Sequence, residues 1–555
     1  MRKGSRAGTK QTPPAPQQAV GERAHVAFIG VGPGDPGLVT LRAAQLLAQA
    51  QVVVVDGADV VDLVRRHARD DAELLTDPAV AVVPEQGAPE QPRSAEGREQ
   101  RLLDAVTSLA DPGLVVRVMS GDPGLFTGLI RECRALADAG VPFEVVPGVS
   151  MLSAVPLYAG IPLTSPESPR LHLLDSSLQQ ELVESAQDDV TVVMLGTPGR
   201  LVDQLSALLE AGRDAATPVA LTDHGSTAMQ HTDVTTLGDA AHVLDRLGED
   251  ERLLAIVGRT VALRTSMSWF ENKPLFGWQV LVPRTKEQAA ATTERLERYG
   301  ARPTTVPTLS IEAPRTPQQL EKAITGLVTG RYEWVGFTSV NAVRAVREKF
   351  DEYGLDARSF AGLRIAAVGG TTSAALRDWG LVPDLVPSGE QSAAGLLEEW
   401  PPYDDLLDPI NRVFLPRADI ATDTLVAGLQ EMGWEVEDVT AYRTVRAAPP
   451  PAEIREAIKT GQFDAVVFTS SSTVRNLVGI AGKPHRATLV ACIGQATAKT
   501  AEEHGLHVDV IAPEASSDSL VDALAGLGYE QARAAYDAGD PIVLPSKRRR
   551  RRRSS

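Results

Sequence analysis

Residues 269–284, WFENKPLFGWQVLVPR, decide how this chain of 555 residues is divided. Before this stretch, residues 251–263 (ERLLAIVGRTVAL) have the pattern of a last buried strand and its exit. After it begins an apolar run typical of a first strand, residues 278–285 (WQVLVPRT). Proline, glycine and polar residues between the two runs interrupt any continuous element. Because single domains seldom exceed about 250–300 residues, the stretch predicts a boundary between two domains rather than a loop within one.

The composition predicts a globular protein without a membrane segment. Hydrophobic residues make up 43% of the chain and charged residues 23%, which allows a core in each half. The sequence has no apolar run of about 18 residues, and no apolar segment follows the basic amino terminus as in a secretory signal. The net charge of −17 argues against general nucleic-acid binding. Cys133 and Cys492 lie far apart, so we expect no disulfide, no metal site and a reducing, cytoplasmic location.

Both ends of the chain differ in composition from the rest. Residues 1–23 are polar and rich in proline and glutamine, and we expect a disordered leader there. Residues 531–555 are expected to form a tail, in which Lys547 precedes six arginines at positions 548–553. Such a run can bind phosphate or a membrane surface, but a solvated tail explains it at least as well. We therefore assign the tail no function.

The first half opens with a β-loop-α-β pattern. A strand at residues 26–29 leads through a glycine-rich turn at 30–37 to a helix at 38–50 and a second strand at 52–55. The glycines allow the backbone to approach a ligand closely, and the interposed prolines stiffen the turn. A dinucleotide fingerprint would require glycine at position 35, where the chain has Asp35, so binding of NAD is not expected.

Further strand-to-loop transitions follow in the first half. A stretch rich in proline, glutamate and glutamine at residues 76–100, expected to be a mobile loop, precedes a helix at residues 101–110. The later segments, in chain order, are LVVRVMSGDPGLF (114–126), VPFEVVPGVSMLSAVPLYAGIPLT (141–164) and TVVMLGTPGRLVDQLSALLEAGRDAATPVALTDHGS (191–226).

In this order and spacing, GVGPGDPGLVTLRA, SGDP, and FEVVPGVS followed by AGIPLT resemble the tetrapyrrole methyltransferases, most closely the uroporphyrinogen-III C-methyltransferases, across residues 24–265. The resemblance implies two α/β lobes, S-adenosylmethionine held between them, methyl transfer to a pyrrole carbon, and a homodimer. It also implies that Asp122 accepts a hydrogen bond and that Met194 forms an apolar wall for adenine. Carried over by position, the cofactor-binding residues are Pro33, Ser120, Gly121, Asp122, Leu125, Ser150, Met151, Met194, Ala220 and Gly225.

Two departures from that family lie on the substrate side. The second loop lacks the family's arginine, and residues 164–166 (TSP) replace the usual Thr-His-Arg. The resemblance therefore supports binding of the cofactor more strongly than it supports the identity of the substrate. One alternative is therefore a domain that binds S-adenosylmethionine without turnover, and another is a domain that methylates a different precorrin.

The second half contains an internal repeat. LVPRTKEQAA (281–290) returns as FLPRADIATD (414–423), and GFTSVNAVRAV (336–346) returns as VFTSSSTVRNL (467–477). A strand, a glycine turn and a helix follow each FTS segment. The repeat predicts two similar α/β lobes.

Each FTS segment places hydroxyl groups at the end of a buried strand and ahead of a helix. The free amides at a helix amino terminus bind anions, and Arg284 and Arg417, each at a strand end, can add a bidentate contact to a carboxylate. Helix capping explains any one of these serines or threonines equally well. The repetition favours a shared cleft between the lobes.

With VPRTKEQA near its start and EVEDVTAYRTVRA (435–447) in the lobe connection, the second half resembles the uroporphyrinogen-III synthases. The match spans residues 278–530, with lobe one at 278–312 and 447–530 and lobe two at 313–446. It implies closure of hydroxymethylbilane with inversion of ring D, without a cofactor. Tyr442 would assist departure of the hydroxyl group, or serve only as a structural tyrosine. The substrate carboxylates would be bound by Arg284, Thr338, Ser339, Arg417, Thr469, Ser470 and Ser471.

Together the two resemblances predict a bifunctional enzyme, joined by a linker at residues 266–277, because the product of the second half is the substrate of the first. It would make uroporphyrinogen III and methylate it to precorrin-2, with tetrapyrroles as its small-molecule partners. The alternative is a synthase whose first half only binds S-adenosylmethionine. A pair of binding-protein lobes without chemistry would require an export signal, which the sequence does not show.

Overall fold

A computed structural model describes residues 23–55, 57, 60–76, 97–125, 128–175, 182–249 and 252–548. The chain divides into two compact units, with the change from one to the other between Gly277 and Trp278 and the short segment Tyr299–Arg302 grouped with the first. Most of the predicted leader, most of the predicted mobile loop and the arginines beyond Arg548 lie outside the described residues. Within the described ranges, no helix is long and apolar enough to cross a bilayer.

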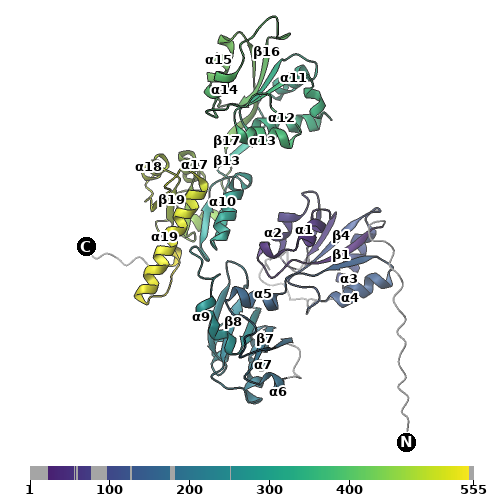
Figure 1. Ribbon diagram of the computed structural model, residues 1–555, viewed down its shortest axis with the longest axis vertical. Coiled ribbons are helices and arrows are strands. Elements are labelled where there is room, and N and C mark those ends of the chain that lie inside the picture. Colours follow the sequence, from purple (N-terminus) through teal and green to yellow (C-terminus); the bar gives the residue numbers. More distant parts are fainter. Residues whose placement is uncertain are drawn as a thin grey trace, which may run out of the picture. The chain divides into compact units, whose positions relative to one another are not determined.

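The first sheet of unit 1 is parallel, in the order β3-β2-β4-β1-β5. Successive residues of β1 face opposite sides: Ala27 and Ile29 pack with α1 and α2, whereas Val26 and Phe28 pack with α3 and α4. Figure 1 shows these two pairs of helices on either side of the sheet. The elements are β1 (His25–Gly30), α1 (Leu41–Leu47), β2 (Val52–Val55), α2 (Val61–His67), β3 (Glu73–Thr76), α3 (Arg98–Thr107), β4 (Leu114–Met119), α4 (Leu129–Asp138) and β5 (Phe143–Val146).

The second sheet of unit 1 is mixed, in the order β6-β7-β10-β8-β9, with β10 antiparallel to both neighbours. Helices α7 and α8 pack on one face and α5 on the other. The elements are α5 (Met151–Tyr158), β6 (Arg170–Asp175), α6 (Leu182–Ser185), β7 (Val190–Gly196), α7 (Pro198–Glu210), β8 (Pro218–Asp223), β9 (His231–Thr236), α8 (Ala240–Leu244), β10 (Leu253–Val257) and α9 (Arg264–Met267).

The predicted linker, residues 266–277, is packed onto unit 1 instead of running free. Trp269 and Phe270 lie edge-on to Tyr158 of α5, with ring centroids 5.1 and 4.6 Å away. A Cβ added at Gly160 would lie 2.6 Å from the Ser268 backbone nitrogen, so glycine there allows the close approach. Leu275 is fully buried. Interrupting residues such as Pro274 end secondary structure, but they do not prevent burial of the aromatic side chains beside them.

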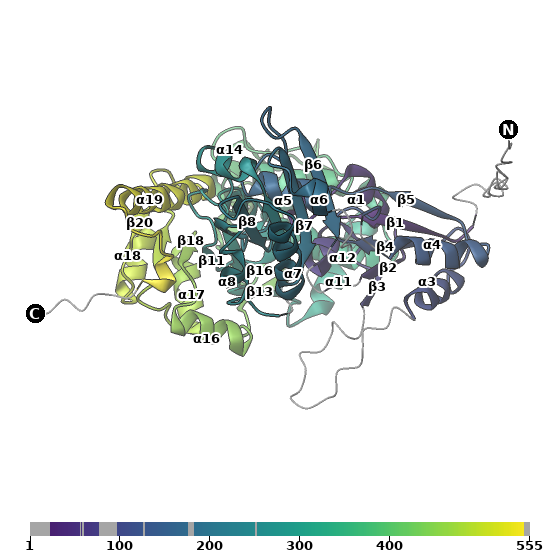
Figure 2. The ribbon, with the colours of Figure 1, turned by 90° about the horizontal axis from the view of Figure 1, so that it is seen from below.

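Unit 2 contains two further sheets. That of lobe one has the order β12-β11-β18-β19-β20, and Figure 2 shows α19 on one side of it and α16 and α17 on the other. The elements are β11 (Gln279–Val282), α10 (Lys286–Arg298), β12 (Arg302–Thr305), α16 (Ala452–Thr460), β18 (Ala465–Phe468), α17 (Ser471–Ala481), β19 (Leu489–Cys492), α18 (Gln495–Glu503), β20 (Val510–Ile511) and α19 (Ser517–Ala538).

Lobe one extends beyond its predicted end at residue 530. Helix α19 continues to Ala538 and ends at Gly539, which has a positive φ of 70°. Arg295 of α10 bonds to Asp522 of α19 at 2.7 and 2.8 Å and fixes the helix along the lobe. The predicted tail therefore begins inside a helix.

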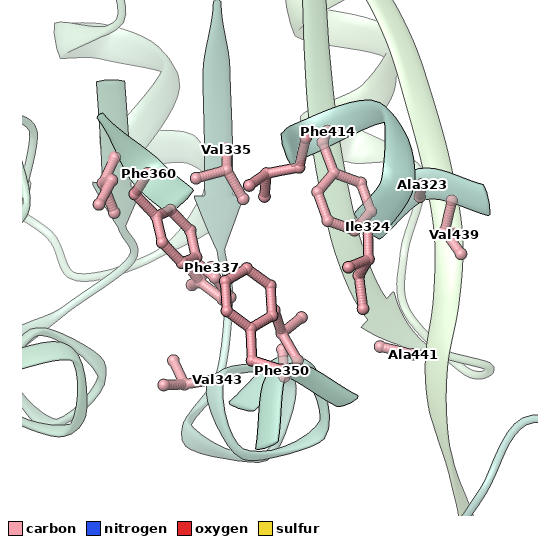
Figure 3. Close-up of a cluster of buried hydrophobic side chains, with 14 of the residues drawn as sticks. Ala323, Ile324, Val335, Phe337, Val343, Phe350, Phe360, Phe414, Val439 and Ala441 are labelled. Carbon is pink, nitrogen blue, oxygen red and sulfur yellow. The ribbon is translucent and has the colours of Figure 1, made fainter. Parts of the chain in front are cut away.

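Lobe two has the sheet order β13-β17-β16-β14-β15. Helices α11 to α13 cover one face and α14 and α15 the other. Phe337 and Phe414 from the strands meet Phe350 of α12 and Phe360 in the first of these cores (Figure 3). The elements are β13 (Leu309–Glu312), α11 (Pro317–Val328), β14 (Trp334–Phe337), α12 (Val340–Glu352), β15 (Arg364–Ala367), α13 (Gly370–Asp378), α14 (Ala393–Glu399), β16 (Arg412–Ala418), α15 (Thr424–Glu431) and β17 (Glu435–Arg446).

The two lobes of unit 2 are joined by an antiparallel ladder of β13 and β17, from Leu309–Arg446 to Glu312–Arg443. Strand β13 was predicted in lobe one, but it adds to the sheet of lobe two. The two-lobed α/β architecture predicted for each half is confirmed.

Candidate functional site

In unit 1, three loops at the carboxyl ends of parallel strands cross at glycines. A Cβ at Gly30, which ends β1, would lie 2.5 Å from the Gly121 carbonyl oxygen, and a Cβ at Gly148 would lie 2.1 Å from the same atom. Gly121 also exchanges backbone hydrogen bonds with Gly32. A side chain at Gly30 or Gly148 would force the loops apart. Glycine is therefore required for the loops after β1, β4 and β5 to meet.

A turn after β8, at residues 224–226, meets the first of these loops. The Asp35 amide donates to Ser226 Oγ at 3.2 Å, and a Cβ at Gly225 would lie 2.4 Å from Cγ2 of Val155 in α5. His224 and Ser226 have positive φ angles of 43° and 61°, which is uncommon for residues other than glycine. Strained backbone of this kind is concentrated at functional sites. The turn thus brings the second sheet to the three crossing loops.

Asp35 lies where these loops meet and carries a carboxylate. One oxygen accepts from the Gly37 amide at 2.7 Å and the other from the Tyr158 hydroxyl at 2.7 Å. Burial, and then the bond to Asp35, raise the pKa of Tyr158 above its usual value near 10. The phenol therefore remains a hydrogen-bond donor throughout the neutral pH range, and it fixes the orientation of the carboxylate.

Behind Tyr158 lies the aromatic pair Trp269 and Phe270, with a lysine over it. The Lys273 ammonium lies 5.3 Å from the Trp269 ring centroid and 4.8 Å from that of Phe270. Burial lowers the pKa of Lys273, and the negative charge of Asp35 acts in the opposite direction. The packed segment after α9 therefore supports the carboxylate site through Tyr158.

In unit 2, the hydroxyl groups of Ser339 and Tyr442 lie 3.0 Å apart. Ser339 caps α12, where its Oγ accepts from the Ala342 amide at 3.1 Å. Tyr442 comes from β17, and its side chain is buried against the main core of lobe two. Two segments more than 100 residues apart in the sequence are thus brought together at the carboxyl end of β14.

A cavity of about 1060 Å³ lies beside the strand ladder that joins the lobes. Val340, Asn341 and Arg344 from the first turns of α12 line one wall, next to Ser339. Thr304, Thr305 and Ser310 add hydroxyl groups from β12 and β13. A volume of this size lies at the upper end of that of small-molecule sites, so the cavity has room for a large organic ligand.

Two family models match the chain. Residues 25–241 match "Tetrapyrrole (Corrin/Porphyrin) Methylases", and residues 290–522 match "Uroporphyrinogen-III synthase HemD". The chain joins a tetrapyrrole methylase domain to a uroporphyrinogen-III synthase domain. The family predictions for both halves are thereby confirmed, and with them the assignment of the chain as an enzyme.

Individual relatives cover the chain to different extents. The porphyrin biosynthesis protein HemD of Ruminiclostridium josui is 29% identical over 518 residues, 91% of this chain and 99% of that protein. The siroheme synthase of Azotobacter vinelandii is 37% identical over 47% of this chain, but the chain spans only 54% of that protein. A uroporphyrin-III C-methyl transferase from Thermus thermophilus, solved in complex with S-adenyl homocysteine, is 29% identical over 43% of this chain and 93% of its own, with a TM-score of 0.35.

Most residues predicted to bind the cofactor of the methylase domain lie around the crossing loops. Met151 Cε would lie 3.5 Å from a Cβ added at Gly121, and Ser150 caps α5 by accepting from the Leu152 amide. Asp122 accepts from the Gly124 amide at 2.7 Å and so shapes the second loop. Pro33 lies in the loop after β1, and Ser120 and Leu125 lie in the loop after β4. Ala220 is on the face of the second sheet that packs on α5, and Gly225 is in the turn after β8.

Met194 is the exception, because its side chain faces the wrong side of the second sheet. It is fully buried in the core beneath α7, whereas Ala220 belongs to the core that faces α5. Its thioether therefore cannot form the predicted wall for adenine. The neighbouring residue Leu195 packs against the α5 side. Successive side chains of a strand face opposite sides of its sheet. In a continuous apolar run such as β7, the sequence does not show which side each residue faces.

In the synthase domain, Arg417 is not available to a substrate carboxylate. Its side chain is 5% exposed, forms a bidentate ion pair with Asp438 and donates to the Thr422 carbonyl at 2.6 Å. Arg284 behaves differently, because no carboxylate in the described part of the chain lies within ion-pair distance of it. The sequence repeat predicted the same role for both arginines, but of the two only Arg284 lacks an ion-pair partner among the described residues.

The hydroxyl groups predicted at the amino terminus of α17 are engaged locally. Ser470 caps the helix in a capping box with Thr473, and Ser471 Oγ donates to the Ala496 carbonyl at 3.0 Å. Thr338 and Thr469 are half-buried at the ends of β14 and β18. Sequence reasoning missed Asp35 and Tyr158, although the acidic residue inside a glycine-rich loop was a visible signal.

Proposed function

We propose that the synthase domain closes hydroxymethylbilane to uroporphyrinogen III and that the methylase domain methylates this product twice to precorrin-2, using S-adenosylmethionine. Support comes from the adjacency of the two domains in one chain, since the product of one reaction is the substrate of the other. Such an enzyme serves the synthesis of sirohaem and cobalamin. We also propose a cytoplasmic location, with which two free cysteines agree, and a homodimer formed through the methylase domain.

The crossing of three glycine loops is the observation that carries the methyl-transfer proposal. Around it lie the small residues Gly121 and Ala220, the thioether of Met151 and the hydroxyls of Ser120 and Ser150, which suit a cofactor with an apolar ring and a polar amino-acid end. S-adenosylmethionine supplies an activated methyl group when it is bound. The loops position the two reactants, and positioning is the larger part of what a protein adds to such a reaction.

We propose Asp35 as the group that accepts the proton lost from the methylated pyrrole. Its two oxygens are held by the Gly37 amide and the Tyr158 hydroxyl, so its orientation is fixed before substrate arrives. A carboxylate oxygen retains lone pairs for a further donor. The other proposed contacts to the cofactor are Pro33, Asp122, Leu125 and Gly225.

In the synthase domain we propose that Tyr442 donates a hydrogen bond to the departing hydroxyl group. Ser339 Oγ already accepts from an amide, so the serine proton can be directed at the Tyr442 oxygen, which leaves the phenolic proton for the substrate. The substrate carboxylates are proposed to meet Arg284, the α12 amides beside Thr338 and Ser339, and the α17 amides beside Thr469, Ser470 and Ser471. No cofactor is proposed here.

The test is an assay of the full chain with hydroxymethylbilane, with and without S-adenosylmethionine, followed by separation of uroporphyrin isomers and mass analysis. We expect type III isomer and, with the cofactor, a gain of two methyl groups. Type I isomer alone would refute the synthase proposal. Type III isomer without methylation would favour the alternative, in which the methylase domain only binds the cofactor or acts on another precorrin.

A further inference from the structure

A second cavity of unit 2, which we call the distal pocket, lies in lobe one. It is at the edge of the sheet opposite the FTS segment of this lobe, residues 468–470. It encloses about 340 Å³ and opens at the amino ends of β19 and β20. The hydroxyl groups of Thr469 to Ser471 follow the carboxyl end of β18, and a strand of four residues separates the two edges by roughly 13 Å. The cavity is therefore distinct from the site proposed for hydroxymethylbilane.

Three segments of the chain enclose this distal pocket. The loop of residues 483–488 forms one side, the loop of residues 505–509 a second, and the carboxyl-terminal segment with Pro545 and Arg548 the third. Asp464, 1% exposed, fixes the third segment: its two oxygens accept from the Ser546 amide at 2.9 Å and from the Gln279 amide at 2.8 Å. The carboxyl-terminal wall of the pocket is thus fixed by a buried carboxylate directly before β18.

The lining is strongly basic in a chain whose net charge is −17. Lys483, Arg486 and Arg548 contribute three fixed positive charges, and His485 and His507 add two imidazoles. Among the described lining residues Asp509 is the only carboxylate: its Oδ2 accepts from the Val490 amide at 2.8 Å, and its Oδ1 lies 3.8 Å from His507 Nε2. In the described part of the chain, neither Lys483 nor Arg486 has an ion-pair partner. The uncompensated charge is therefore positive.

Two details direct donors into this space. Gly505 has a positive φ of 73°, and a Cβ there would lie 2.9 Å from Lys483 Nζ, so the glycine leaves room for the ammonium. His485 Nδ1 accepts from the Ala487 amide at 3.2 Å, so in the neutral ring the proton is on Nε2, which becomes a donor. Both of these donors come from the loop of residues 483–488, and Arg548 adds a third from the carboxyl-terminal segment, so the donors do not belong to one helix end.

We propose that the distal pocket binds a small phosphate-type oxyanion, such as pyrophosphate or the phosphate group of a metabolite. Donors arriving from two separate segments of the lining suit a tetrahedral anion with oxygens on every side better than a planar carboxylate with two. The volume holds a small ligand but not an entire tetrapyrrole. The proposal is independent of the reactions assigned above.

The experiment is isothermal titration of the full chain with pyrophosphate at constant ionic strength. Wild type is compared with Lys483→Gln/Arg486→Gln and with the control Lys322→Gln/Arg377→Gln, which removes the same charge from exposed positions of lobe two. We expect one saturable site in wild type and in the control, and at least a tenfold loss of affinity in the pocket variant. Arg548→Gln, at the third wall, provides a separate variant with the same expected direction.

Several results would overturn the proposal. One is the absence of saturable binding by wild type, and another is an equal loss of affinity in the control. Binding that survives the pocket variants but is lost in Arg284→Gln would place the anion beside the cavity between the lobes. Citrate binding as tightly as pyrophosphate would refute the phosphate class.

Discussion

The hydroxyl oxygens of Ser339 and Tyr442 lie 3.0 Å apart, and this contact joins the helix cap of α12 to strand β17 of lobe two. Strand β17 continues from Tyr442 into the ladder with β13 that leads to the other lobe. Any movement of that ladder therefore changes the surroundings of the phenol directly.

The first prediction concerns this phenol. We expect Tyr442→Phe to slow formation of the type III isomer by at least tenfold, because general-acid groups contribute about 10² to 10⁴ in rate and a single hydrogen bond about 0.5–1.5 kcal/mol. The measurement is the ratio of type III to type I isomer at short times. Ser339→Ala should reduce the rate less, and the double variant should be no worse than Tyr442→Phe. A full rate with lowered thermal stability would show a purely structural tyrosine.

Substitution of the two arginines of the repeat, Arg284 and Arg417, should have different effects. Arg284→Gln is expected to raise KM for hydroxymethylbilane several-fold with little change in unfolding temperature, because its side chain forms no ion pair with the residues that the structure describes. Arg417→Gln should lower the free energy of unfolding by about 1–3 kcal/mol, less than for a fully buried pair because Asp438 is 38% exposed. Steady-state kinetics and urea denaturation distinguish the two effects. Equal changes in KM would contradict the assignment.

Gly148→Ala tests the crossing loops. Its Cβ would lie 2.1 Å from the Gly121 oxygen, and relieving such an overlap costs about 1–3 kcal/mol. We expect loss of methylated product while the synthase domain of the same chain continues to form type III isomer. Gly199→Ala is the control, since an added Cβ at this position in α7 would meet no described atom within 4 Å beyond its chain neighbours and the backbone of its own helix. Methylation by Gly148→Ala at the wild-type rate would show that the loops tolerate displacement.

Tyr158 should make the stability of the methylase domain depend on pH in the alkaline range. Its folded-state pKa is raised, so its contribution to stability is complete below the unfolded value near 10 and is lost as the pH rises through the folded value. Wild type should therefore lose stability more steeply above about pH 10 than Tyr158→Phe does. Urea denaturation at a series of pH values measures the slopes. Equal slopes for wild type and Tyr158→Phe would mean that folding does not raise the pKa of Tyr158.

The two thiols should react slowly in the native protein. Burial raises the pKa of Cys492 to about 12, and burial also raises the pKa of Cys133, which is half-buried. Because only the thiolate reacts, we expect iodoacetamide at pH 8 to modify Cys133 slowly and Cys492 only after unfolding. Mass spectrometry of timed samples measures this order. Rapid labelling of native Cys492 would contradict its burial.

Much of the fold was predictable because apolar runs and glycine turns report on local structure. The strand at residues 52–55 and the four sheets followed from such patterns. The orientation of Met194 and the ion pair of Arg417 did not, because both depend on which neighbour a buried side chain meets after folding. The bond from Tyr158 to Asp35 joins residues 123 positions apart, and no local pattern contains such a pair.

The packed segment after α9 also determines where the methylase domain can be separated from the rest of the protein. A fragment cut at residue 265 would lose Trp269, Phe270 and Leu275, and with them the aromatic support of Tyr158. For separate production of this domain, the last residue should therefore follow Leu275, although homology to the family model ends at residue 241.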